Sequence, residues 1–100
     1  MVTRISPQEF READGLEDWQ VEDDAASIVL KTPDFGAGAA FVGDIAEIAN
    51  GMNHHPDVDL RYSTVTVRTS THSEGGLTDL DVALAQRVTE AARARGFRPA

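Results

Sequence analysis

The sequence contains no cysteine and few basic residues, and both shortages limit what the protein can be. Without cysteine there is no disulfide, no thiolate nucleophile and no cysteine-ligated metal site. Nine basic residues stand against 17 acidic ones, so the formal net charge is -8 at pH 7. Because phosphate groups repel such a surface, the charge argues against nucleic acid and anionic membranes as partners.

Long apolar runs are also missing. No stretch approaches the roughly 18 apolar residues that a membrane-spanning helix needs. The N-terminal sequence, MVTRISPQEF, lacks the apolar core of a secretory signal peptide. We therefore expect a soluble, cytoplasmic protein. The length of 100 residues suits one domain, and residues 1–100 contain neither a repeat nor an interdomain linker.

Turn and periodicity signals predict a helix and a hairpin in the first third of the chain. The segment Ser6-Pro7-Gln8-Glu9 is typical of a capped helix start, and the short helix should end near Gly15. Residues 19–21 alternate apolar and polar side chains, and residues 27–31 are β-branched and apolar. These two stretches predict a β-hairpin.

A long helix is predicted from Phe35 to Met52, with Asp34 as its N-cap. Its apolar residues recur at steps of three and four and should form one wide buried face. They are Phe41, Val42, Ile45, Ala46, Ile48, Ala49 and Met52. Gly51 and Pro56 should end the helix.

A second hairpin and a last helix follow. Val58, Leu60 and Tyr62 alternate with polar residues and predict a half-buried strand. After a turn near Ser63, the next strand should carry two sets of alternate residues. Val65, Val67, Thr69 and Thr71 should share one face, and the other face should include His72 if the strand stays regular that far. The last helix has an apolar stripe of Leu77, Leu80, Leu84, Val88 and Ala91, and Gly96 should end it.

The resulting order, α-β-β-α-β-β-α, predicts an α+β domain. We expect a four-stranded antiparallel sheet with the helices packed on one face. Valine and threonine on the outward faces of the strands favour an oligomer.

All three histidines of the chain lie in one stretch, NHHPDVDLRYSTVTVRTSTH. His54 and His55 precede Pro56, which favours an extended conformation at His55 and stiffens the corner. Because the chain reverses near residue 63, His72 should return close to the other two histidines. The stretch therefore predicts a pocket.

Two kinds of chemistry fit such a pocket. Three histidines and a water would suit catalytic zinc, with Asp57, Asp59 or Asp81 as an added ligand. Adjacent histidines point apart on an extended chain, however, so acid–base chemistry fits better. A histidine with a pKa of about 6.5 both gives and takes protons at neutral pH. Asp81 would lie three residues after a Thr78 N-cap, where a carboxylate stabilises a helix, and it could also orient a histidine.

The segment NHHPDVDLRYSTVTVRTSTHSEGGLTDLD resembles the signature of the pterin-4a-carbinolamine dehydratases. The family has His-His-Pro, an aromatic residue six positions after the proline, a histidine ten positions later and then an aspartate. The corresponding residues here are His54, His55, Pro56, Tyr62, His72 and Asp81. The resemblance extends from Glu9 to Ala91 and includes Trp19.

The resemblance implies the same seven-element fold, assembled as a homodimer or homotetramer. It implies loss of water from a 4a-hydroxytetrahydropterin to give the quinonoid dihydropterin, in the recycling of the pterin that aromatic amino acid hydroxylases use. No metal or organic cofactor is implied. His54 and His72 would transfer protons around the hydroxyl, His55 would bind the pterin, and Asp81 would orient a histidine. The resemblance does not separate acid from base.

One position departs from the family pattern. The family usually has a charged residue, most often glutamate, four positions before the first histidine, and this chain has Asn50 there. Asparagine can hydrogen-bond a pterin or a histidine, but it cannot ionise. Glu47, one turn earlier, would substitute only if the helix were rotated or extended. The alternative function is therefore a non-catalytic binding or assembly protein, such as a dimerisation cofactor or chaperone.

Overall fold

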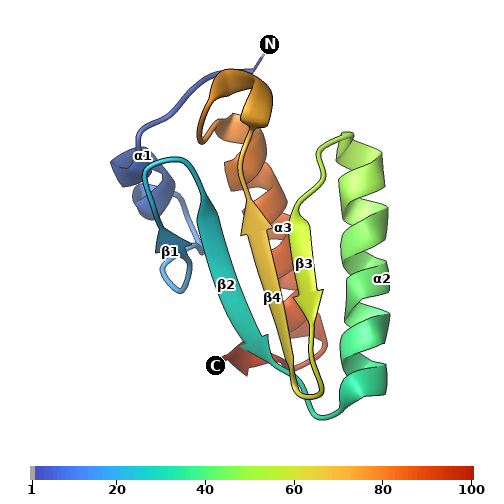
Figure 1. Ribbon diagram of the computed structural model, residues 1–100. Helices are drawn as coiled ribbons and strands as arrows, with labels where there is room; N and C mark the ends of the chain where they lie inside the picture. The colour runs from blue at the N-terminus through green and yellow to red at the C-terminus, as the bar shows by residue number, and fades with distance from the viewer. Residues whose placement is uncertain (1) are drawn as a thin grey trace.

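The computed structural model describes residues 2–100, which form helices packed against an antiparallel sheet (Figure 1). The elements are α1 (Pro7–Glu12), β1 (Gln20–Val21), β2 (Ala26–Lys31), α2 (Phe35–Met52), β3 (Asp57–Leu60), β4 (Thr64–Thr69), η1 (His72–Glu74), α3 (Asp79–Ala94) and β5 (Arg98–Pro99). The predicted α-β-β-α-β-β-α order is confirmed. The 3₁₀ turn η1 and the short strand β5 are additions that the sequence analysis did not predict.

The strands follow the order β1-β2-β4-β3, and every pairing is antiparallel. β4 lies between its two neighbours, opposite β2 from Thr64 to Thr69 and opposite β3 from Leu60 to Asp57. β5 pairs with the end of β2, on the edge that β1 also occupies. The pairing of β1 with β2 and of β3 with β4 confirms the two predicted hairpins. It also places the C-terminal end of β4 beside the start of β3.

Side-chain caps fix the helix ends. The predicted capping box of α1 joins Ser6 and Glu9, and Asp34 caps α2 by accepting a hydrogen bond from the N–H of Ala37 at 2.8 Å. α2 ends at Asn53, whose φ of 51° is left-handed, a conformation that asparagine tolerates better than most residues. This turn directs the chain from the end of α2 toward β3.

The core lies between one face of the sheet and helices α2 and α3, which pack side by side (Figure 1). Its largest buried side chains include Phe10, Leu16, Phe41, Ile45, Val65, Val67, Leu77, Leu84 and Val88. The indole N–H of Trp19 donates to the Thr89 hydroxyl at 2.9 Å. α2 approaches the sheet closely at Gly38, because a Cβ atom there would lie 2.9 Å from Cδ1 of Leu60.

β3 is more exposed than its alternating pattern predicts. Val58 is 36% exposed, and Tyr62 is 75% exposed and lies beyond the strand. The reason is the position of β3 at an edge, where only β4 pairs with it among the described residues. Ala46, predicted on the buried face of α2, is exposed as well. Within residues 2–100, no helix is long and apolar enough to cross a membrane.

Candidate active site

His54 lies in the corner between α2 and β3, and its ring points into the protein. Its backbone N–H bonds to the carbonyl of Ala49 at 3.1 Å, which continues the turn begun at Asn53. The residue is only 8% exposed, whereas the adjacent His55 is exposed and Pro56 is half-buried. The two neighbouring histidines therefore point in different directions, as an extended chain requires.

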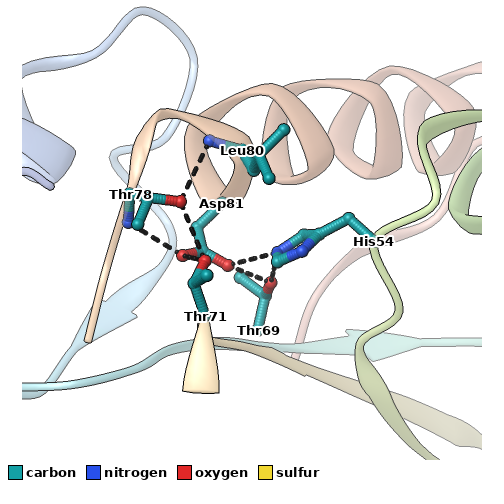
Figure 2. Close-up of polar contacts among 6 residues, drawn as sticks. All are labelled: His54, Thr69, Thr71, Thr78, Leu80 and Asp81. Carbon is teal, nitrogen blue, oxygen red and sulfur yellow. Dashed lines mark hydrogen bonds and ion pairs between the residues drawn. The ribbon is translucent and has the colours of Figure 1, made fainter. Parts of the chain in front are cut away.

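Asp81, in the first turn of α3, is fully buried and collects four hydrogen bonds (Figure 2). Its Oδ1 lies 2.7 Å from Nε2 of His54 and 2.6 Å from the Thr69 hydroxyl. Its Oδ2 lies 2.8 Å from the Thr71 hydroxyl and 2.9 Å from the backbone N of Thr78. The predicted capping box of α3 is thus confirmed, and the same carboxylate contacts a histidine.

Three segments that are distant in sequence meet at this carboxylate. The α2–β3 corner supplies His54, the end of β4 and the segment that follows it supply Thr69 and Thr71, and α3 supplies Asp81 itself (Figure 2). Because all these side chains are buried, their polar atoms need partners within the protein. The network therefore fixes the position of the His54 ring.

His55 has a different partner. Its Nε2 lies 3.0 Å from Oδ1 of Asn50, in the last turns of α2, and both residues are exposed. Asn50 thus acts on the outer histidine, and Glu47 hydrogen-bonds neither histidine within the described chain. Asn50, His55 and Pro56 line one end of a hollow of about 190 Å³, whose other walls are apolar residues of α2 and β3.

His72 is exposed and lies in η1, directly after Thr71. Continuing the β3–β4 register from the Asp57–Arg68 pair places His54 opposite Thr71, so the chain does return to this corner. The regular strand ends at Thr69, however, because Thr71 forms a bridge with Gly76 across η1. His72 is therefore next to the network in sequence, and within residues 2–100 its side chain makes no hydrogen bond to either of the other histidines.

The arrangement supports proton transfer. A buried carboxylate that is hydrogen-bonded to an imidazole holds the ring in place and in one orientation. Within the described residues, no group of three histidine, aspartate or glutamate side chains is placed to hold a metal ion.

Sequence reasoning missed the hydroxyl partners of Asp81. Thr69 and Thr71 were predicted on the same strand face as Val65 and Val67, and Thr78 as a cap, but none was assigned to the site. The available signal was this shared face, because hydroxyls that lie beside buried valines need hydrogen-bond partners within the protein.

Comparison with known proteins identifies the family. The model of the family Pterin 4 alpha carbinolamine dehydratase matches residues 3–91. A protein of Nocardia farcinica, named for the same dehydratase, is 45% identical over 78 residues, which cover 78% of this chain and 82% of the relative. A Metallosphaera sedula protein with the same name is 39% identical, over an alignment that covers 87% of this chain and 92% of the relative. The chain therefore belongs to the pterin-4a-carbinolamine dehydratase family.

One solved structure agrees with this assignment, and a second shares the fold. The crystal structure of a transcriptional coactivator/pterin dehydratase from Brucella melitensis superposes with a TM-score of 0.82 at 33% identity, covering 90% of this chain and 99% of the other. A pterin dehydratase-like protein, described as a RuBisCO assembly factor in the alpha-carboxysome, shares the fold with a TM-score of 0.60 at 17% identity.

Proposed function

We propose that this protein dehydrates 4a-hydroxytetrahydropterin to the quinonoid dihydropterin by histidine acid–base catalysis. The observation that carries the proposal is the pairing of His54 with the buried Asp81, beside His55 and close in sequence to His72, in a chain of this family. The pathway context is recycling of the pterin used in aromatic amino acid hydroxylation.

The chemistry requires two proton transfers. The 4a-hydroxyl leaves readily only after it is protonated, and a ring N–H must lose its proton as the new double bond forms. We assign these transfers to His54 and His72, with His55 binding and positioning the pterin. Asp81 orients His54, Pro56 fixes the corner, and Asn50 orients His55 through its amide oxygen. The overall reaction loses only water, so its atoms balance without an oxidant or reductant.

We further propose that the protein is a homodimer or homotetramer. The outer edge of β3 offers unpaired backbone groups within the described chain, and Val29 on the open face of the sheet is 41% exposed. Sedimentation equilibrium would show a mass of two or four chains, and a monomer at micromolar concentration would contradict this assignment. The cytoplasmic location stays a prediction.

The dehydration assay tests the proposed activity. Freshly generated 4a-hydroxytetrahydropterin is mixed with the protein, and formation of the quinonoid dihydropterin is followed against the spontaneous reaction. We expect a rate that rises in proportion to protein concentration. A rate equal to the spontaneous one would refute the proposal.

Asn50 favours a second candidate function, which is binding or assembly without turnover. The family usually has a charged residue at position 50, whereas the amide of Asn50 cannot ionise. This amide contacts the exposed His55. On this alternative the protein would bind pterin or a protein partner without accelerating dehydration. Calorimetric titration with a stable dihydropterin, run beside the assay, separates the two functions.

A further inference from the structure

We infer that the hydrogen-bond network around Asp81 holds neutral His54 as the Nε2–H tautomer, so that Nδ1 is the nitrogen that exchanges a proton with the substrate. The inference rests on the proposed dehydratase function and assigns the working atom of its central histidine.

The direction of each hydrogen bond on Oδ2 of Asp81 follows from its partners. An ionised carboxylate has acceptor positions only, about four in all, and a backbone N–H can only donate. The N–H of Thr78 therefore donates to Oδ2 at 2.9 Å, and the Thr71 hydroxyl donates there at 2.8 Å. Since Thr71 has then used its only hydroxyl proton, Thr78 must donate across the 2.8 Å contact between the two hydroxyls. Thr78 Oγ1 in turn accepts from the N–H of Leu80 at 3.2 Å.

The same reasoning fixes the ring of His54. On Oδ1 the Thr69 hydroxyl donates at 2.6 Å, and Nε2 of His54 lies at 2.7 Å (Figure 2). A ring protonated only at Nδ1 would point the Nε2 lone pair at a carboxylate oxygen, which is repulsive at this distance. The neutral ring therefore carries its proton on Nε2, with the unprotonated nitrogen at Nδ1.

Nδ1 is the ring nitrogen of His54 that has no hydrogen-bond partner within residues 2–100. Unlike the Thr32 hydroxyl, this atom is not fully shielded from solvent, although the residue is only 8% exposed. A substrate ring nitrogen can therefore give its proton to Nδ1, while the electron pair of that N–H bond forms the new double bond to C4a. The C4a–O pair leaves with the hydroxyl, which becomes water on taking a proton from His72. The negative Asp81 stabilises the resulting imidazolium.

Exchanging Asp81 for asparagine reverses the predicted tautomer. The N–H of Thr78 cannot rotate or accept, so the amide oxygen of an Asp81→Asn side chain must stay at the Oδ2 position. The amide NH₂ group then faces Nε2 of His54, which must become an acceptor and move its proton to Nδ1. Asp34→Asn is the matched control, because Asp34 also caps a helix through a backbone N–H but belongs to the other end of α2.

The test is ¹⁵N nuclear magnetic resonance of histidine-labelled protein without substrate, at a pH where the rings are neutral. We expect His54 to show a protonated Nε2 in the wild type and in Asp34→Asn, and a protonated Nδ1 in Asp81→Asn. The kcat of Asp81→Asn should fall by about 100-fold or more, the scale of one general acid–base contribution, with a smaller change in KM.

Each outcome decides the inference. A wild-type ring with its proton on Nδ1, or an even mixture, overturns the inference whatever the activity, and this spectrum needs no variant to fold. Full activity in an Asp81→Asn protein with the reversed tautomer overturns the assignment of Nδ1. A wild type with the Nε2–H ring but no dehydration overturns the proposed function, and with it the role of Nδ1, while leaving the tautomer established.

Discussion

Removing the Thr69 hydroxyl should destabilise the protein more than the loss of an ordinary neutral hydrogen bond does. Thr69 is buried, and its hydroxyl donates to Oδ1 of the fully buried Asp81 at 2.6 Å. A hydrogen bond to an ionised group contributes about 1.5–3 kcal/mol, against about 0.5–1.5 kcal/mol between neutral groups. Thr69→Val keeps the shape of the side chain, so it isolates the loss of this donor.

We therefore expect Thr69→Val to lower the free energy of unfolding by about 2 kcal/mol. In a domain of this size, 1 kcal/mol corresponds to about 4–8 °C in the melting temperature, so the expected decrease is about 8–16 °C. Thr69→Ser keeps the hydroxyl and removes one buried methyl group, so its loss should be nearer 1 kcal/mol. The dehydration rate should fall only a few-fold, because Thr69 contacts the carboxylate and His54 keeps its bond to Asp81.

The assay is urea unfolding followed by circular dichroism, with Thr89→Val as a reference for a buried hydroxyl that bonds a neutral group, the Trp19 indole. A double-mutant cycle of Thr69→Val with Asp81→Asn isolates the pairwise energy. Coupling near zero, or a Thr69→Val protein as stable as the wild type, would refute the description of Asp81 as an ionised, fully hydrogen-bonded carboxylate.

Further predictions concern single side chains. Asn50→Glu places a charged acceptor beside His55 and should raise the dehydration rate if the neutral amide limits turnover; an unchanged rate would show that Asn50 is not limiting. His72→Ala should reduce the rate strongly but leave the melting temperature within about 4 °C, because His72 is exposed and changes at exposed positions rarely exceed about 0.5 kcal/mol; a large loss of stability would contradict its placement. Gly38→Ala should change the free energy of unfolding by less than about 1 kcal/mol, because the end of the Leu60 side chain can move away from the new methyl group and alanine favours a helix by about 1 kcal/mol over glycine; a loss above about 3 kcal/mol would show that Leu60 cannot yield.

Local signals were sufficient to predict much of the fold. The Asp34 cap and the apolar spacing predicted α2 with its observed bounds, because both depend on residues within one helix. The extent of β3 burial was not predictable in this way. Alternation at Val58 and Tyr62 has the same form in a central strand and in an edge strand, and only the sheet order decides which side chains are covered. β5 has two residues, too few for any periodicity.

The site was predictable as a set of residue types but not as a network. The turn near Ser63 was enough to bring His54 toward the end of β4. The partner of each histidine depends instead on the docking of α3, which brings Asp81 under His54, and on the left-handed turn at Asn53, which sends the His54 ring inward. Neither follows from spacing along the chain, so Thr69 and Thr71 became visible as partners only in the structure.

The most direct test of the proposed function compares wild type and His54→Ala in the dehydration assay, with each protein first shown to be folded by circular dichroism. The assignment predicts that wild type accelerates dehydration in proportion to its concentration and that His54→Ala loses about 100-fold or more of the enzymatic rate. A His54→Ala protein that retains the wild-type rate would contradict the assignment of His54 as the central proton-transfer group.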